Sequence, residues 1–198
     1  MNIFVLHLNQ RKAAKWHVDK HVVKMLLETV QLLYTAHWVK AYPELVNYKA
    51  PITLAKYQKN LEEPESMKTA PSPDSSPNMR GYRPCHVNHP CAKWARETIG
   101  NYKWLATLGL ELAIEYTYRY NKEHSCEKHI VWLYQNLPEN MKCPLRTPFA
   151  IAMDDEYKVL DGNKYDPVKS YRNYYNTSKK ERGLIQYTKR STPNWLSV

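Results

Sequence analysis

The longest regular pattern in the chain runs from Arg11 to about Ala41, where apolar residues recur every three or four positions. Positions spaced in this way lie on one face of an α-helix, and no glycine or proline interrupts the stretch. The pattern therefore predicts one long helix that ends before Pro43. The apolar face of this helix comprises Val18, Val22, Met25, Leu26, Val30 and Leu33.

A second helical pattern follows Pro90, a residue suited to the first position of a helix. The sequence predicts that this helix continues from Cys91 to about Tyr120, and that Gly100 and Gly109 weaken it only locally. The apolar positions that carry its pattern are Trp94, Ile99, Leu105, Leu108, Leu112 and Tyr116.

Two shorter helices follow in the C-terminal half. Ser125 to Leu137 keeps helical spacing and stops before Pro138. Asp166 and Pro167 form a typical cap and first helical residue, and Gly183 is a suitable stop, so the last helix should lie between them.

The remaining stretches are less regular. Residues 1–8 alternate too weakly for a strand and indicate an extended or capping segment, whereas Ile52 to Glu62 favours a short helix. The proline- and serine-rich stretch at about 63–83 predicts a mobile insertion near a binding surface, and Pro138, Pro144 and Pro148 indicate irregular structure. We therefore expect an all-α fold: one helical domain over residues 1–198, with a basic aromatic segment at about 164–198.

Composition narrows the class of partner. No run approaches the roughly 18 apolar residues of a membrane helix, and no export signal is visible, so we expect a cytoplasmic or nucleoid-associated protein without a membrane partner. If the protein is viral, the host cytoplasm is expected. A formal charge of +10 favours a polyanion, and 16 Tyr and 6 Trp against 2 Phe favour base stacking. We expect DNA as the partner, with no cofactor and no obligate protein partner.

The four cysteines, Cys85, Cys91, Cys126 and Cys143, are expected to be free thiols in such a compartment. Cys85, His86, His89 and Cys91 do place four potential zinc ligands in one short segment. Their spacing matches no zinc motif, so an ordinary loop is the favoured interpretation and a metal site the lesser one.

Polar residues line one face of the predicted first helix. His17, His21, Lys24 and Glu28 fall at steps of four, three and four, and Gln31 extends the stripe. The face is either a solvated surface or a site. As a site, its histidines and carboxylate could bind a metal, or could act on a sugar–base bond, where a carboxylate stabilises positive charge.

Cations also gather near the start of the second long helix. Arg83, His86, His89, Lys93 and Arg96 surround a predicted helix amino terminus, whose free amides favour an anion. This pattern predicts phosphate-backbone contacts, although a helix cap with incidental charge explains it as well.

The C-terminal segment interleaves cations with aromatic residues. From Lys164 to Arg190 there are eight Lys or Arg against two acidic residues, a pattern that suits backbone tracking and base stacking. Some of the tyrosines should instead pack the last helix onto the core. The predicted DNA contacts are Arg172, Tyr174, Tyr175, Lys179, Lys180, Arg182 and Trp195.

Three features of the chain resemble the pyrimidine-dimer DNA glycosylase (endonuclease V-like) family. They are the segment Met1 to Leu8 followed by a helix that bears His17, the later helix start at His89-Pro90, and the aromatic segment with Tyr171 to Tyr175 and Trp195. The sequence is also similar to a group of uncharacterised phage and virus proteins that share three short motifs. These are Asp19-Lys20-His21, Asn88-His89-Pro90 and Tyr171-Arg172-Asn173-Tyr174-Tyr175.

The resemblance implies a compact helical enzyme whose own α-amino group, at Met1 or Asn2, attacks the sugar C1′, expels the base and forms a Schiff base. A glutamate on the first helix and Arg or His residues that hold phosphates would assist. The family exposes a small residue after methionine removal, where this chain has Asn2, and its glutamate corresponds in position to Lys24, one turn before Glu28. Base excision without the lyase step, or a related base modification, therefore stays open.

Two other function classes compete with this one. The chain could be a non-catalytic nucleic-acid-binding protein, or a metal-dependent nucleotide or phosphoester hydrolase that uses the His/Glu face. For the glycosylase hypothesis, we predict that His17, His21 and Glu28 meet the His86/His89 loop in one concave site, with Glu28 as the catalytic carboxylate.

Overall fold

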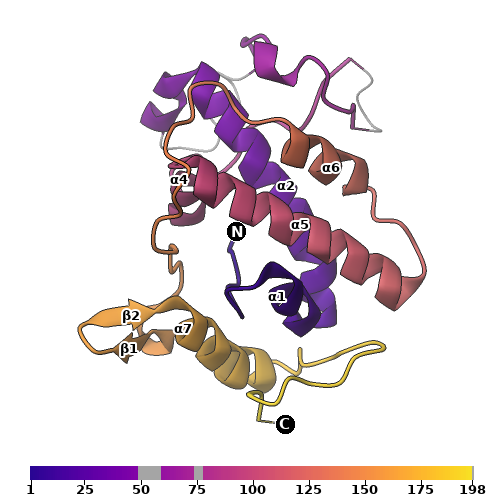
Figure 1. Cartoon of the computed structure of the whole chain (residues 1–198), viewed down its shortest axis with the longest axis vertical. Coiled ribbons are helices and arrows are strands. Elements are labelled where there is room, and N and C mark those ends of the chain that lie inside the picture. The colour runs from indigo at the N-terminus through magenta and orange to yellow at the C-terminus, as the bar shows by residue number, and fades with distance from the viewer. Residues whose placement is uncertain (49–58, 74–77, 198) are drawn as a thin grey trace.

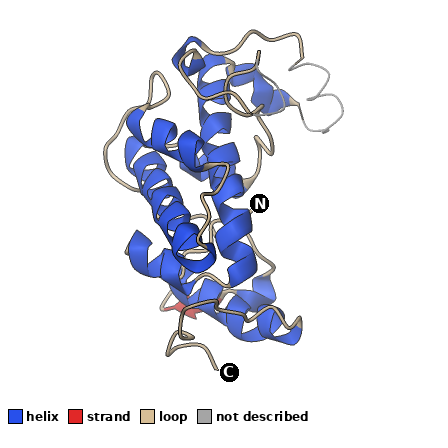
Figure 2. Cartoon of the chain, turned by 90° about the vertical axis from the view of Figure 1, so that its right-hand side faces the viewer, coloured by secondary structure: helices blue, strands red, loops and turns tan. Residues whose placement is uncertain are grey.

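A computed structural model describes residues 1–48, 59–73 and 78–197. These residues form six α-helices and one two-stranded antiparallel hairpin, so the expected all-α class is confirmed and the hairpin is a small addition to it. Figure 1 shows the long helices α2 and α5 side by side, with α7 and the hairpin at one end of the molecule. The second view shows the same helical body and the single small patch of strand (Figure 2).

The centre of the protein is the contact between α2 (Asp19–Ala41) and α5 (Ile99–Tyr120), the most extensive contact between two elements of the described chain. The helices α1 (Gln10–Trp16) and α6 (Glu127–Gln135) also pack on α5. Gly109 permits this packing, because a Cβ atom there would lie 2.5 Å from Cδ1 of Ile130 on α6. The glycine in mid-helix is thus a site of close helix approach.

The first predicted helix is wrong as a single element, because the chain breaks at His17 and Val18 between α1 and α2. Both residues have extended backbone angles, with ψ of 134° and 156°, and both are fully buried. The break places the two side chains in the core together, which a continuous helix would not do. Asn9 caps α1 by accepting a hydrogen bond from the Lys12 amide at 3.0 Å.

The second predicted helix is also two elements, α4 (Pro90–Ala95) and α5. Pro90 does occupy the first turn of α4, as predicted, but the helix ends before Arg96. Thr98 then starts α5 anew, because its hydroxyl accepts a hydrogen bond from the Asn101 amide at 3.1 Å. An N-cap residue with extended backbone cannot lie inside a continuous helix.

The last helices follow the prediction closely. The helix α6 lies within the expected range, and α7 (Pro167–Tyr174) is capped by Asp166, whose carboxylate accepts from the Lys169 amide at 2.7 Å. The helix continues through a π-helical turn, η4 (Tyr175–Lys179), and the chain turns at Gly183 with a φ of +62°. Just before α7, β1 (Val159–Asp161) pairs with β2 (Lys164–Asp166) in an antiparallel hairpin that the sequence analysis did not predict.

Three short 3₁₀ helices complete the structure: η1 (Pro43–Asn47), η2 (Glu65–Met67) and η3 (Asp155–Tyr157). The described part of the predicted insertion at 63–83 packs on the core, since Met67 and Ala70 are buried. The helix expected over Ile52–Glu62 lies mostly outside the described residues, and its described end, 59–62, has no helix.

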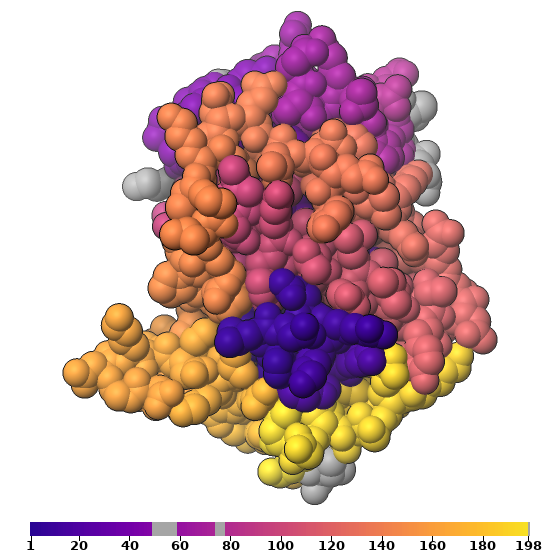
Figure 3. Space-filling model, in the orientation of Figure 1, coloured from indigo at the N-terminus to yellow at the C-terminus, as the bar shows by residue number. Residues whose placement is uncertain are grey.

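The amino-terminal residues are extended, as expected, and Ile3 to Leu6 are buried. The space-filling view shows the start of the chain, in indigo, at the surface between the body of the molecule and the yellow C-terminal segment (Figure 3). Ion pairs attach the C-terminal segment to the helical body. Arg190 donates two hydrogen bonds to Glu115, at 2.9 and 2.8 Å, and Arg119 joins Glu115 to Asp19.

Among the described residues, no helix is long and apolar enough to cross a membrane. All four cysteines are free thiols: Cys143 is exposed, Cys85 is half-buried, and Cys91 and Cys126 are buried.

Candidate functional site

The start of the chain lies against Glu28, in the middle of α2. The Met1 amino nitrogen is 3.9 Å from Oε2 of Glu28, and the Asn2 amide donates a hydrogen bond to the same oxygen at 3.0 Å. Lys24, one turn earlier on α2, places its Nζ 3.4 Å from the other carboxylate oxygen. Glu28 is only 8 % exposed. The result is a buried carboxylate held between an amino group and a lysine.

The Asn2 side chain fixes this arrangement. Its Oδ1 accepts a hydrogen bond from the Tyr171 hydroxyl of α7 at 2.7 Å, and its Nδ2 donates to the Ala152 carbonyl at 2.8 Å. The Cys91 thiol of α4 also contacts Oδ1, at 3.7 Å. Four segments that are distant in sequence therefore meet at the first two residues.

The loop that carries His86 and His89 reaches the same place. Partial burial lowers the pKa of His89, the Met1 ammonium and His86 lower it further, and the Glu28 carboxylate opposes them. Burial raises the pKa of the Cys91 thiol to about 11, and that thiol also feels the charges of the Met1 amine and Glu28. Glu28 and the His86/His89 loop, which the sequence analysis placed together, thus share one electrostatic neighbourhood.

The four potential zinc ligands of this loop do not converge. His89 Nδ1 accepts a hydrogen bond from the Cys91 amide at 3.2 Å, and Cys85 is hydrogen-bonded through its backbone to Thr35. In the parts of the chain that the structure describes, no three His, Cys, Asp or Glu side chains form a group that could hold a metal ion.

His21 lies about two turns before Glu28 on α2 and is also buried. Its Nδ1 is 2.6 Å from the Tyr175 hydroxyl, and its ring stacks on Phe4 with centroids 4.2 Å apart. Burial, with help from His17, Lys179 and other nearby cations, lowers the pKa of His21 to about 2. His21 is therefore neutral, and Tyr175, a predicted DNA contact, is fully buried as its partner.

His17 is not part of a helical face with His21, because the helix breaks between them. It is fully buried, its Nδ1 bonds to the Ala13 carbonyl at 2.7 Å, and burial lowers its pKa to about 4. Its Nε2 has no hydrogen-bond partner among the described residues. The single polar stripe from His17 to Glu28 is thus corrected: only the part from His21 onward is continuous.

Lys179, at the end of the C-terminal helix, is a buried cation that lies near other cations, including Lys24 of α2. Lys179 is 7 % exposed, and its Nζ lies 5.1 Å from the Tyr174 ring centre and 5.8 Å from that of Phe4. Burial lowers the pKa of Lys179, Arg182 and Lys24 lower it further, and Tyr174 opposes them. No carboxylate among the described residues pairs with Lys179, whereas Lys180 and Arg182 are exposed.

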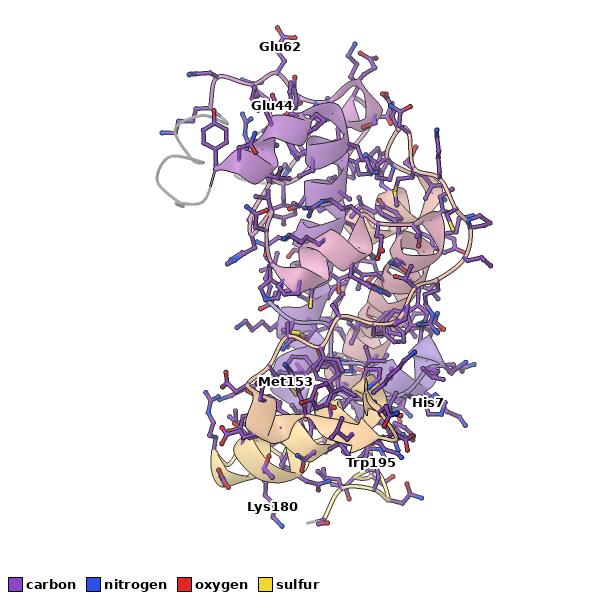
Figure 4. All side chains as sticks on the ribbon, turned by 90° about the vertical axis from the view of Figure 1, so that its left-hand side faces the viewer. His7, Glu44, Glu62, Met153, Lys180 and Trp195 are labelled. Atoms are coloured by element: carbon purple, nitrogen blue, oxygen red, sulfur yellow. The ribbon has the colours of Figure 1, made fainter. Side chains whose placement is uncertain are left out.

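The aromatic residues of the C-terminal segment mostly pack on the protein. Arg172 lies between the rings of Trp16 and Trp195, 5.0 and 5.2 Å from their centres, and donates a hydrogen bond to the Leu6 carbonyl. Trp195 is half-buried, and its Nε1 is buried without a partner among the described residues. Tyr174 is half-buried against Tyr157. Figure 4 shows Trp195, Lys180 and Met153 at one end of the molecule, away from Glu44 and Glu62.

The other predicted contacts lie elsewhere. Arg83 stacks on Trp38 at 5.2 Å, about 15 Å along α2 from Glu28 by helix geometry. Lys93 and Arg96 line a cleft over α4 that is lined by none of Glu28, His17 and His21. Of the residues predicted to form one concave site, Glu28 is linked to the helix that follows the His86/His89 loop, because Asn2 contacts both Glu28 and Cys91. His21 lies about two turns before Glu28 on α2, and His17 is buried beyond the helix break.

Sequence reasoning missed the roles of Tyr171 and of the Arg119 ion pairs. The sequence analysis included Tyr171 only as part of the motif Tyr171 to Tyr175. Its partner Asn2 lies 169 positions away. No local pattern links two residues so far apart. The sequence did contain the signal for the unpredicted hairpin, because Gly162-Asn163 is a typical two-residue hairpin loop.

Comparison of the chain with protein-family models, with curated proteins and with solved structures found no match.

Proposed function

We propose that the chain is a DNA-glycosylase-like enzyme that cleaves the bond between a base and its sugar, with Glu28 as the central catalytic residue. The observation that carries the proposal is the buried carboxylate of Glu28 next to the Met1 amine. A primary amine next to a carboxylate that can take up its proton is a suitable nucleophile.

The chemistry follows from this pair. The neutral amine would form a bond to C1′ of the sugar while the C1′–base bond breaks. The electron pair of the broken bond leaves with the base. The nitrogen then loses a proton, and its lone pair forms the C1′=N bond of the Schiff base. The C1′–O4′ electron pair goes to O4′, which takes up a proton and becomes a hydroxyl. Glu28 would stabilise the positive charge that builds on the sugar and accept the proton from nitrogen.

Two nitrogens lie near Glu28, and the proposal allows either. Met1 N is 3.9 Å from Oε2, and Asn2 N is 3.0 Å from the same atom. If methionine is removed, Asn2 N becomes the amine at the closer position. If no amine reacts, the same carboxylate could assist attack by water, which is base excision without a lyase step.

The basic surroundings support a nucleic-acid substrate. Lys179 is buried without a carboxylate partner among the described residues, and Lys24 and Arg182 lie near enough to lower its pKa. Like charges brought together in this way destabilise one another unless an anion joins them. A DNA phosphate beside Glu28 is the anion we propose.

The test uses the full chain with no tag before Met1, and intact mass identifies its first residue. Duplex and single-stranded oligonucleotides that carry a pyrimidine dimer or another damaged or modified base are incubated with borohydride. Trapping of a covalent protein–DNA species supports the amine mechanism, and base release without trapping supports water attack. No release from any substrate would favour a non-catalytic DNA-binding protein.

Glu28→Gln keeps the shape of the side chain and removes its charge. We expect base release per bound complex to fall by a factor on the order of 10² or more, while DNA binding holds. Glu123→Gln, at an exposed position, is the matched control and should match the wild type. If Glu28→Gln loses DNA binding but keeps its turnover per bound complex, Glu28 is structural.

A further inference from the structure

A separate cleft lies over α4, between that helix, the end of α2 with η1, and the segment 148–150. We call it the α4 cleft. Its volume is about 760 Å³, within the range of small-molecule sites. Figure 4 views the molecule from this side, with Glu44 of η1 above α4 and Met153 below it. The cleft is lined by Val39, Lys40, Pro43, Val46, Pro90, Lys93, Trp94, Arg96, Glu97, Pro148 and Ala150.

The polar lining of the α4 cleft is cationic. Lys40, Lys93 and Arg96 face a single carboxylate, that of Glu97. Glu97 is held by the Thr147 hydroxyl at 2.8 Å and the Asn101 amide at 3.3 Å, so it does not neutralise the cations through an ion pair. The cleft thus carries an excess of two positive charges. A phosphate monoester carries about −1.5 to −2 at neutral pH, whereas each phosphodiester of a DNA backbone carries one charge.

Two nitrogen donors beside the cleft have no partner. Nη1 of Arg96 and Nε1 of Trp94 are buried and make no hydrogen bond with any described residue. Arg96 forms no ion pair within the described part of the chain, and burial lowers its pKa. Leaving such donors unsatisfied costs free energy, which an acceptor-rich ligand would recover.

The rest of the lining is apolar. Pro43 and Val46 of η1 lie on one side, and Pro148 and Ala150 on the other. Apolar walls around a few placed polar groups suit a ligand with one apolar or aromatic part and one charged part. Inorganic phosphate would leave these walls unused.

We propose that the α4 cleft binds a nucleoside 5′-monophosphate, with its phosphate on Arg96, Lys93 and Lys40 and its base between the proline and valine walls. The proposal does not rest on the reaction at Glu28, because Glu28 does not line the cleft. It assigns Lys93 and Arg96 to a free nucleotide rather than to a duplex backbone.

Isothermal titration of the full chain with deoxyadenosine 5′-monophosphate, deoxyadenosine and inorganic phosphate tests this assignment. The nucleotide should bind at least about tenfold more tightly than either fragment, since only the nucleotide uses both the cations and the apolar walls. Arg96→Gln and Lys93→Gln should each weaken nucleotide binding by about tenfold. Lys93 is exposed, so its variant should fold normally.

Two controls separate this proposal from the proposed function. Arg11→Gln, at an exposed position of α1, and Glu28→Gln should bind the nucleotide as the wild type does. Loss of nucleotide binding in Glu28→Gln would place the nucleotide at Glu28 and overturn the assignment. So would equal affinity for phosphate and nucleotide, unchanged binding in both cleft variants, or no binding at millimolar nucleotide.

Discussion

Three buried histidines, His17, His21 and His37, are held neutral by the fold. Burial lowers their pKa values to about 4, about 2 and about 3, against an ordinary value of about 6.5. His37 bonds to the hydroxyls of Ser66 and Tyr102, both at 3.0 Å, and so fills a polar gap between α2 and α5. Each of these rings ties the stability of the protein to pH.

The sign of this dependence follows from proton binding. Below about pH 6.5 the unfolded chain takes up protons at these rings that the folded chain does not, so stability is lost as pH falls from about 6.5 toward about 4. Each histidine should contribute up to about 1.4 kcal/mol per pH unit in that window. Urea unfolding at several pH values measures the slope, and His37→Gln should reduce it by up to about 1.4 kcal/mol per pH unit. Equal stability at about pH 7 and about pH 5 would contradict the prediction.

At the same scale, sequence reasoning placed Lys24 and Glu28 correctly on one helix face but took His17 for part of that face. Spacing predicts a shared face only while the helix is continuous, and the break at His17 and Val18 contains no glycine or proline to reveal it. The partners of Glu28 lie at Met1 and Asn2, which periodicity cannot connect to α2.

At the scale of elements, Gly100 has a role that its place in a helix conceals. It lies in the first turn of α5, and a Cβ atom there would be 2.5 Å from the Leu145 carbonyl carbon and from the Pro144 carbonyl oxygen. The irregular segment 144–146 therefore crosses directly over the start of α5.

Gly100→Ala separates helix propensity from packing. In an exposed helix the change would stabilise by about 1 kcal/mol, but here backbone atoms must move, so we expect destabilisation of about 1–3 kcal/mol. Thermal or urea unfolding checks the sign. Gly183→Ala is a second comparison: nothing lies within 4 Å of its added Cβ, so any loss there reflects its φ of +62° alone. A stabilised Gly100→Ala variant would refute the close approach.

Most helices were predictable because their apolar faces are regular and uninterrupted. The helix starts were marked by Asn9, Thr98 and Asp166, all residues that cap well, and only Asp166 was used in the prediction. The two missed breaks are places where the burial of His17 and Val18 or the cap at Thr98 outweighs local helix propensity. Tertiary contacts decide such positions, and one sequence does not display them.

At the scale of the whole molecule, the C-terminal segment has two different surfaces. Arg172, Lys189 and Arg190 are used within the protein, since Lys189 bonds to Asn121 at 2.9 Å and Arg190 to Glu115. Lys180 and Arg182 are exposed. The segment therefore has fewer cations available at its surface for a proposed DNA partner than its composition suggests.

We expect duplex DNA binding to depend on salt through Lys180 and Arg182. Each phosphate contact contributes about 0.9 to the slope of log affinity against log salt, so Lys180→Gln with Arg182→Gln should lower the slope by about 2. Fluorescence anisotropy at several salt concentrations measures this slope. Lys103→Gln with Lys122→Gln removes the same charge from exposed positions elsewhere and should lower it less. Equal slopes for the two pairs would exclude the C-terminal surface.

The four thiols differ in a way that allows selective chemical labelling. Burial raises the pKa values of Cys85, Cys91 and Cys126, which keeps them protonated and slow to react. Cys143 alone among the four is exposed. A maleimide dye should therefore attach at Cys143 without any prior cysteine replacement, and it would sit next to the segment that crosses the start of α5. The native sequence thus supplies its own attachment point for a dye with which the proposed DNA binding can be measured in solution.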